Sequence, residues 1–413
     1  MERALDVVLF GATGFTGHLV AEYLAQNHAG KLRWAIAGRN EAKLANVKAE
    51  LVRIAPALAD LEVLVADSSD AAALAEIAKK TRVVCTTVGP YAVHGMPLAR
   101  ACAEHGTSYC DLTGEVTFVR ASIDENHARA QESKARIVHC AGFDSIPSDL
   151  GVLILHEAFR AAGKQLAKAS FFCGPMKGGV SGGTVASMME LLEAASHDPE
   201  LRRLVGDPYA LMPNRAKDRG PDGADQMDVR YDDRLEQWTG PFVMAAINTR
   251  VVQRSNALMD FSYGKEFAYS EAMSFGGGPK GFARAAALTA GLGGFVGIAS
   301  FGPGRKLLGK FVPAPGQGPS KAARDAGYFK VRIVGEGGGV RIDARVEGTS
   351  DPGYGETAKM LGESAVCLAK DEEALPARYG VLTPAAGMGM ALVNRLRAKG
   401  MTFETREVGP SAS

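Results

Sequence analysis

A glycine-rich turn near the N-terminus constrains the fold of this chain more than any other feature. Its sequence is Gly11-Ala12-Thr13-Gly14-Phe15-Thr16-Gly17. It follows an apolar strand expected over residues 5–10 and precedes a helix expected over residues 18–27. Gly11 allows a tight turn, Gly14 lets the backbone approach a pyrophosphate, and Gly17 lets the helix pack closely on the strand. We predict that these seven residues bind a dinucleotide; the alternative is a tight turn that binds nothing.

The same alternation of strand and helix continues through the first 145 residues. Further apolar strands are expected over 34–37, 61–66, 83–88, 108–112 and 137–141, with helices over 41–54, 71–80, 97–104 and 116–133. Strands that are apolar throughout and alternate with helices are typical of an α/β fold with a doubly wound parallel sheet. The second half is less regular, with a hairpin expected over residues 329–348 and helices over 355–368 and 384–398.

Length, charge and cysteine usage exclude several classes of protein. The 413 residues suffice for two or three domains, and 47 basic against 46 acidic residues argue against nucleic-acid binding. None of the six cysteines forms a C-x-x-C pair, so we expect neither a metal site nor a disulfide framework. The N-terminus does not resemble a signal peptide. We therefore expect a cytoplasmic protein.

The end of the second strand distinguishes between the two nicotinamide cofactors. NAD sites place an acidic residue there, whereas an arginine accommodates the 2′-phosphate of NADP. This chain has Arg39 and Asn40 and no acid, which favours NADP(H) unless Arg39 is an ordinary surface residue. Asp67, at the end of the third strand, can accept a hydrogen bond from the adenine amine or cap the following helix.

Candidate catalytic residues follow the fourth strand. Gly89 and Pro90 leave room for a nicotinamide against the backbone, and Tyr91 and His94 are the nearest proton donors in the sequence. A packed aromatic ring and a surface imidazole are the alternatives for Tyr91 and His94.

Two later strands also end in polar residues. Asp111, Thr113 and Glu115 follow the fifth strand, where capping of the next helix is favoured over contact with the cofactor ribose. Asp144 and Ser145 follow the sixth strand and either contact nicotinamide or substrate or, for Ser145, cap a helix. We count Asp144 among the candidate catalytic residues.

Taken together, these motifs resemble the saccharopine dehydrogenase-like oxidoreductases, in particular the subfamily of mycobacterial trans-acting enoyl reductases. The resemblance rests on the glycine turn, the Ala37–Arg39 strand end, Val88–Tyr91, Gly142–Asp149, Asp351–Tyr354 and Leu382–Ala385. It implies NADP(H), a Rossmann domain over residues 1–145, and an α+β substrate domain with a mixed sheet over 146–350. It also implies C-terminal helices over 351–413 that return to the Rossmann side, and reduction of a carbon–carbon double bond in a lipid.

The middle of the chain fits an apolar substrate. Residues 282–301 combine large apolar side chains with glycine and alanine, as in a helix that lines a groove or packs in a core. We expect the part over 285–301 to lie against the substrate site or a membrane surface without spanning a bilayer, because it is short and interrupted by glycines.

Arg250 and Arg254 lie on one face of a helix if their stretch is helical. That face either binds a phosphopantetheine or a carboxylate or faces solvent, and we favour the solvent-facing alternative.

Three functions remain open on the sequence. The first is an NADPH-dependent reductase of an unsaturated acyl chain, free or bound to a carrier. The second is a saccharopine-type amino-acid dehydrogenase, which needs clustered arginines. The third is a non-catalytic NADP-binding protein at lipid surfaces. A homodimer is compatible with all three.

Overall fold

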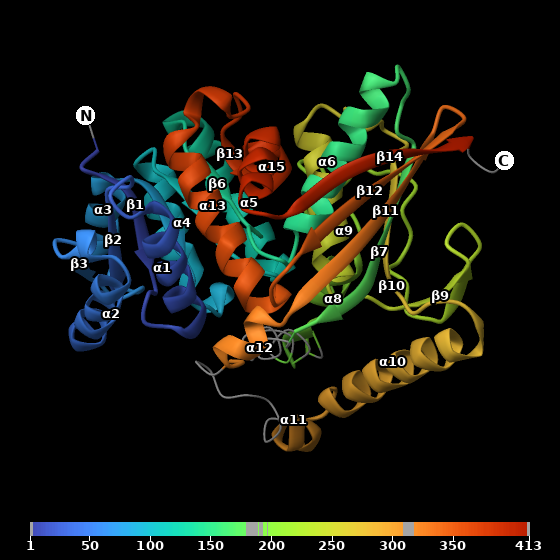
Figure 1. The fold of residues 1–413 in the computed structure, drawn as a ribbon, viewed down its shortest axis with the longest axis horizontal. Helices are drawn as coiled ribbons and strands as arrows, with labels where there is room; N and C mark the ends of the chain where they lie inside the picture. The colour runs from blue at the N-terminus through green and yellow to red at the C-terminus, as the bar shows by residue number, and fades with distance from the viewer. Residues whose placement is uncertain (1–2, 179–188, 190–192, 196, 309–317, 411–413) are drawn as a thin grey trace. The chain divides into compact units, whose positions relative to one another are not determined.

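The computed structural model describes residues 3–178, 189, 193–195, 197–308 and 318–410 (Figure 1). Clustering of contacts divides the chain into two compact units. Unit 1 comprises residues 1–146, 316–318 and 353–400, and unit 2 comprises residues 147–315, 319–352 and 401–413. Apart from residues 316–318, the chain therefore leaves unit 1 after residue 146 and returns to it at residue 353.

Unit 1 is built on a parallel sheet of seven strands. In chain order these are β1 (Leu5–Phe10), β2 (Trp34–Gly38), β3 (Glu62–Val65), β4 (Thr81–Thr86), β5 (Ser108–Cys110), β6 (Arg136–Val138) and β13 (Gly380–Leu382). Their order in the sheet is β13-β6-β5-β4-β1-β2-β3, and all neighbours are parallel. This order reverses direction between β1 and β4, as in a doubly wound dinucleotide-binding sheet, and confirms the predicted fold class.

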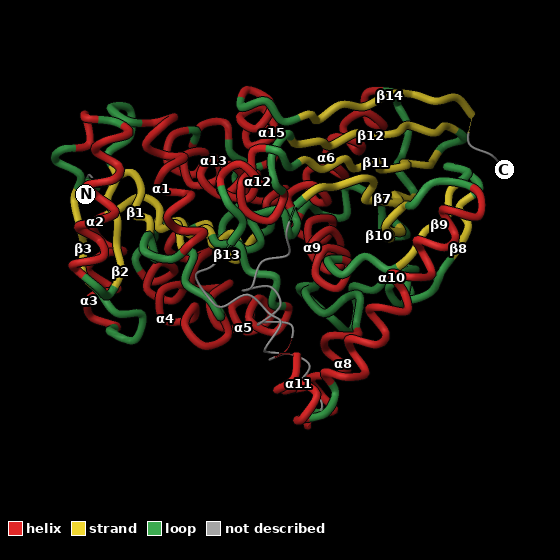
Figure 2. The backbone as a smooth tube through the Cα atoms, turned by 60° about the horizontal axis from the view of Figure 1, so that its bottom comes forward, coloured by secondary structure: helices red, strands yellow, loops and turns green. Residues whose placement is uncertain are grey.

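Helices connect the strands of unit 1 (Figure 2). They are α1 (Phe15–His28), α2 (Glu41–Ile54), α3 (Ala71–Lys80), α4 (Tyr91–Glu104), α5 (Val116–Ser133), α13 (Thr357–Lys370), α14 (Pro384–Gly387) and α15 (Gly389–Ala398). The predicted start of α4 at Pro97 was wrong, because the helix begins at Tyr91 and contains Pro97. The carboxylate of Glu115 accepts hydrogen bonds from the N–H groups of Tyr91 (3.0 Å) and Ala92 (2.7 Å), which caps the earlier start.

Unit 2 contains a second, mixed sheet. Its strands are β7 (Lys168–Lys177), β8 (Arg230–Asp232), β9 (Gln237–Gly240), β10 (Ala268–Ser274), β11 (Tyr328–Gly337), β12 (Val340–Gly348) and β14 (Thr402–Pro410). They lie in the order β14-β12-β11-β7-β10-β9-β8. β7 and β10 are parallel and the other pairs antiparallel, and β11 and β12 form the predicted hairpin.

One part of the predicted C-terminal helical segment was wrong. Residues 402–410 form β14, which pairs antiparallel with β12 in unit 2. Thr402, Thr405 and Val408 are β-branched and favour an extended backbone, and Phe403 is buried. Of the segment over residues 351–413, only residues 353–400 lie in unit 1, and they contain β13 as well as the helices between residues 357 and 398.

The helices of unit 2 are α6 (Ile146–Ala161), α8 (Pro199–Gly206), α9 (Ala245–Leu258), α10 (Gly278–Ala299), α11 (Gly302–Leu308) and α12 (Lys321–Asp325). α6 packs directly on the sheet, because a Cβ atom at Gly151 would lie 2.3 Å from Cδ1 of Ile333. Phe329, Val331 and Ile333 alternate with exposed residues along β11, so one face of this strand is buried.

Candidate functional site

The glycine turn has the backbone geometry that a dinucleotide phosphate requires. Gly11 has φ +94°, and a Cβ atom there would lie 2.7 Å from Cγ2 of Val88. A Cβ atom at Gly17 would lie 2.1 Å from the carbonyl oxygen of Gly11, so only glycine permits this approach of α1. α1 begins after Gly14 without a side-chain cap, and Thr13 and Gly14 are exposed. Backbone N–H groups at an uncapped helix start can receive a phosphate.

Arg39 is an available cation at the end of β2. Its side chain is exposed and has no hydrogen bond or ion pair with the described residues. Asn40 instead caps α2 through a 2.9 Å hydrogen bond from the N–H of Lys43. Asp67 Oδ1 accepts hydrogen bonds from the hydroxyl and N–H of Ser69, which lower its pKa, with a smaller contribution from Arg39. Asp70, and not Asp67, caps α3.

Of the two candidate proton donors after β4, Tyr91 is buried and His94 is more accessible. Gly89 is exposed and Pro90 half-buried. The Tyr91 hydroxyl is buried, donates to the carbonyl of Thr86 at 3.2 Å, and has its pKa raised by burial. This environment favours a packed aromatic ring over a proton donor. His94 is half-buried on α4, with Nδ1 3.5 Å from Oγ of Ser68.

Asp111, after β5, is fully engaged inside unit 1. Its Oδ2 accepts from the Tyr109 hydroxyl at 2.9 Å and contacts Nδ1 of His139 at 2.7 Å. Its Oδ1 accepts from the N–H groups of Thr113 (3.1 Å) and Cys140 (3.2 Å). Asp111 therefore ties the ends of β5 and β6 together, and its interior contacts argue against a role at the cofactor ribose.

No motif in the sequence predicted how this network extends beyond Asp111. His139 Nε2 lies 2.8 Å from Oγ of Ser122 on α5, and both residues are buried. The prediction that Glu115 caps the next helix was also wrong, because its carboxylate caps α4 instead. The oxygen Oγ1 of Thr113 accepts the N–H of Glu115 at 3.1 Å, which holds the turn between them.

Asp144, in the turn after β6, has a very different environment. It is half-buried, and no other side chain among the described residues donates a hydrogen bond to it. Burial, with a smaller contribution from the charge of Asp111, raises its pKa from 3.8 to about 7. The turn is held by Thr357 at the start of α13, whose Oγ1 accepts the N–H of Phe143 at 3.1 Å. Asp144 can therefore carry a transferable proton near neutral pH.

The C-terminal part of unit 1 supplies a contact to the glycine turn that sequence reasoning did not assign. The Tyr354 ring meets the Phe15 ring edge-on, with 4.9 Å between centroids. Tyr354 lies in a π-helical turn over Pro352–Glu356, directly before α13. The only sequence signal for this contact is that Asp351-Pro352-Gly353-Tyr354 is one of the motifs on which the family resemblance rests. Tyr354 and Thr357 thus connect the α13 end to the two candidate turns.

Arg250 and Arg254 do not form a substrate-binding or solvent-exposed face. They are 2% and 1% exposed on α9. Arg250 pairs with Asp225 at 2.5 Å and donates to the carbonyl of Val205 at 3.0 Å, while Arg254 donates to the carbonyl of Leu211 at 2.6 Å. The favoured prediction of a solvent-facing pair was wrong. These arginines instead bind the segment over residues 205–225, which precedes α9 in the sequence, onto that helix.

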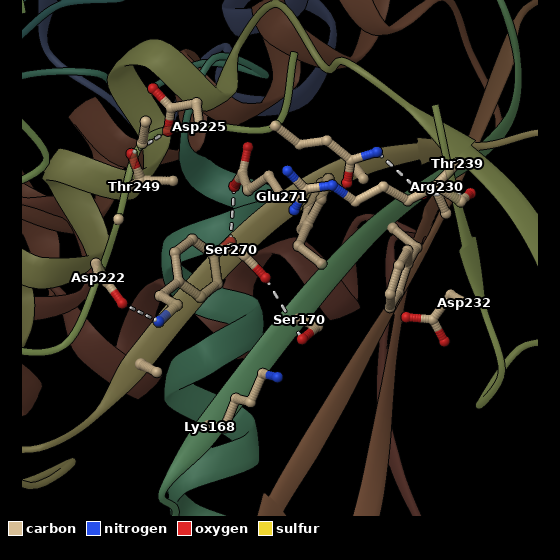
Figure 3. Close-up of a pocket in the computed structure, with 18 of the residues that line it drawn as sticks. Lys168, Ser170, Asp222, Asp225, Arg230, Asp232, Thr239, Thr249, Ser270 and Glu271 are labelled. Atoms are coloured by element: carbon tan, nitrogen blue, oxygen red, sulfur yellow. Dashed lines mark hydrogen bonds between the residues drawn. The ribbon is translucent and has the colours of Figure 1, made fainter. Parts of the chain in front are cut away.

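Unit 2 also contains a polar cavity of about 350 Å³, which lies between its sheet and the segment before α9 that includes residues 221–226 (Figure 3). Ser170 of β7 and Ser270 of β10 lie 3.5 Å apart in its wall. Burial raises the pKa of Asp222 to about 6 and of Glu271 to about 7. None of the predicted cofactor or catalytic residues lines this cavity, and its carboxyl groups do not suit an apolar acyl chain.

Comparison with known proteins identifies the chain. Residues 7–138 match the saccharopine dehydrogenase NADP-binding domain. The chain is 44% identical over 420 residues to a putative trans-acting enoyl reductase of Mycobacterium tuberculosis, with 98% of each protein covered. It is 42% identical to a trans-acting enoyl reductase of Mycobacterium ulcerans, with 97% of each covered. The chain belongs to the trans-acting enoyl reductase family.

The fold of this family member also resembles that of a solved protein. Saccharopine dehydrogenase (L-Glu forming) from Saccharomyces cerevisiae superposes with a TM-score of 0.54 over 98% of this chain and 99% of that one, at 13% identity. That likeness concerns the fold alone. The predicted family, the oxidoreductase class and the NADP(H) cofactor are confirmed by the comparisons.

The observed residues fit NADP(H). The glycine turn would receive the pyrophosphate, because a side chain at Gly11 or Gly17 would collide with its surroundings and the start of α1 is uncapped. Arg39 would pair with the 2′-phosphate, since its guanidinium is exposed and has no partner in the described chain. The roles of the individual residues remain predictions.

Proposed function

We propose that this protein is an NADPH-dependent enoyl reductase that acts on an unsaturated lipid or polyketide-type acyl chain bound to a carrier protein. The names of its full-length relatives support the reaction, and their designation as trans-acting supports a substrate delivered by another protein. The structural observation that carries the proposal is Asp144, a carboxyl with a pKa of about 7 in the turn after β6, a strand of the sheet that also carries the glycine turn.

Enoyl reduction adds a hydride to the β-carbon and a proton to the α-carbon. NADPH, when bound, supplies the hydride. The protein must therefore supply the proton and hold the acyl carbonyl in place. Asp144 gives up its proton to the α-carbon as the double bond is consumed, and the resulting carboxylate recovers a proton from water.

Asp144 meets these requirements better than the other candidates in unit 1. Asp111 is surrounded by four donors and lies in the interior. Tyr91 is buried, and its hydroxyl is bound to a backbone carbonyl. His94 remains a second candidate, because it is half-buried and its nearest polar contact is a long one of 3.5 Å to Ser68.

The amino-acid dehydrogenase alternative loses the residues on which it depended. A substrate with several carboxylates needs clustered cations, and the two arginines considered for this role are buried on α9 with partners of their own.

The test is oxidation of NADPH in the presence of 2-enoyl thioesters of increasing chain length, free and loaded on an acyl carrier protein. Deuterium at C4 of NADPH should appear at the β-carbon of the product, which mass spectrometry detects. A protein that binds NADPH but reduces none of these thioesters would contradict the proposal, and turnover of a 2-oxo acid with an amine would favour the amino-acid dehydrogenase.

A further inference from the structure

The helix α10 in unit 2 is apolar and yet exposed. By length and composition it is long and apolar enough to cross a membrane, with a mean hydropathy of 1.4. Only 11% of its most apolar 18-residue stretch is buried. Figure 1 shows α10 as a long helix at the margin of unit 2. A core helix would be covered, so this helix calls for another apolar environment.

The exposure of α10 is not confined to one side. Val296, Gly297 and Ile298 are exposed at three successive positions, which point about 100° apart around a helix. Phe282 is 47% exposed, and Phe301 just beyond the helix is 54% exposed. A groove-binding helix would present a single apolar face, whereas a lipid environment accepts apolar residues on several sides.

The sequence around α10 is entirely free of acidic residues. From Ala272 to Arg324 the chain contains no Asp or Glu, but it contains Lys280, Arg284, Arg305, Lys306, Lys310, Lys321 and Arg324. Lys280 and Arg284, in the first two turns, are exposed and have no ion pair among the described residues. Arg305 pairs with Glu193 at 3.0 Å. An apolar helix inside a basic segment is complementary to the headgroups of anionic lipids.

Aromatic residues gather at the N-terminal end of α10. The Trp238 ring meets the Phe282 ring edge-on at 4.9 Å and the Tyr231 ring at 5.2 Å. Tyr231 is 45% exposed. Tryptophan and tyrosine prefer the boundary between lipid and water, where the ring is apolar and its polar group stays hydrated.

We propose that α10 docks unit 2 on the surface of an anionic phospholipid membrane and lies within the interface. The strand before it, β10, and the strand after it, β11, both pair with β7. A single crossing would place the two ends of α10 on opposite sides of the bilayer, whereas these strands belong to one sheet. The helix therefore enters the interface and the chain returns to the same side.

A second copy of this chain is the competing occupant. Ala283, Ala287, Ala290 and Gly294 are small and exposed, and such residues allow two helices to approach closely. Lipid is favoured because the acid-free segment offers a second copy no opposite charge to pair with. This proposal is independent of the reductase function, since a protein without turnover would still bind vesicles.

The test is co-sedimentation of the full-length protein with vesicles of phosphatidylcholine, alone and mixed equally with phosphatidylglycerol. We expect binding to the mixed vesicles that high salt weakens. Val296→Glu with Ile298→Glu should reduce it at least tenfold, as should Lys280→Glu with Arg284→Glu. The matched controls Met227→Glu with Val408→Glu and Lys164→Glu with Lys265→Glu, which change exposed residues elsewhere in unit 2, should bind like wild type.

Two results would overturn the proposal. One is equal binding by the α10 variants and their controls. The other is a dimer in analytical ultracentrifugation that the Val296→Glu/Ile298→Glu variant converts to a monomer while no form sediments with vesicles; that result would assign α10 to self-association. NADPH affinity and the melting temperature, measured on every variant, show whether unit 1 and the overall fold remain intact.

Discussion

The ends of β5 and β6 carry two aspartates with opposite surroundings. Asp111 has contacts with four hydrogen-bonding groups and is fully buried. Asp144 is half-buried, and burial, with no side-chain donor among the described residues to offset it, raises its pKa to about 7. Both residues follow a strand of the same parallel sheet, so position alone does not make a strand-end carboxyl catalytic. The difference lies in whether the interior already satisfies its oxygens.

The arginines repeat this contrast. Arg39 at the end of β2 is exposed and has no partner in the described chain, whereas Arg250 and Arg254 are buried and bonded to backbone carbonyls. A cation without a protein partner remains available for a ligand phosphate. A buried, hydrogen-bonded cation instead stabilises the segment it binds.

The largest expected effect is on turnover, from Asp144→Asn. The amide has the same shape and no acidic proton, so kcat should fall by roughly 10²–10⁴-fold, the usual contribution of a general acid. NADPH affinity should not change. In the wild type, kcat should decline above about pH 7, because the carboxyl then loses its proton. Unchanged kcat in the folded variant would shift the role of acid to His94 or water.

Asp111→Asn should mainly affect stability. Replacing one oxygen by an amide sets N–H groups against N–H groups in a buried site, which should cost about 3 kcal/mol in the free energy of unfolding. Urea denaturation measures this loss, and turnover per folded molecule should remain near that of the wild type. A clear fall in turnover per folded molecule would indicate that Asp111 acts in catalysis.

Asp144→Asn should have the opposite effect on stability. The folded-state pKa of about 7 lies above the ordinary 3.8, so between these values the folded protein holds a proton that the unfolded chain releases. Raising the pH from about 4 to about 7 therefore removes stability from the wild type and not from the variant. The melting temperature of the variant should exceed that of the wild type at pH 8, and a lower one would show that Asp144 is structural.

Arg39→Ala tests the available cation. It should weaken NADPH binding by roughly 1–3 kcal/mol, the range for a charge-assisted hydrogen bond, and leave NADH binding nearly unchanged. Arg53→Ala, at an exposed position on α2, is the matched control. Isothermal titration of both cofactors gives the comparison, and equal losses for NADPH and NADH would contradict the assignment of Arg39.

The parallel sheet and its glycine turn could be predicted because both leave local signals. Apolar strands alternate with helices, and Gly11 and Gly17 stand where a Cβ atom cannot fit. The partners of the polar residues could not be predicted in the same way. His139 meets Ser122, and Glu115 caps a helix more than twenty residues away in the sequence, through contacts that only the folded sheet creates. β14 was missed because its partner β12 is also distant in the chain.

The smallest expected effect comes from Tyr91→Phe. The Tyr91 hydroxyl donates a hydrogen bond of 3.2 Å to the carbonyl of Thr86, and its ring packs against Phe118 with 5.7 Å between centroids. Phenylalanine keeps the ring contact and removes only the hydroxyl, so the free energy of unfolding should fall by about 1 kcal/mol. Turnover and its dependence on pH should match the wild type, because the buried hydroxyl donates to the backbone and not to a ligand. A fall in kcat of the size expected for Asp144→Asn would reverse the order of the two residues as proton donors.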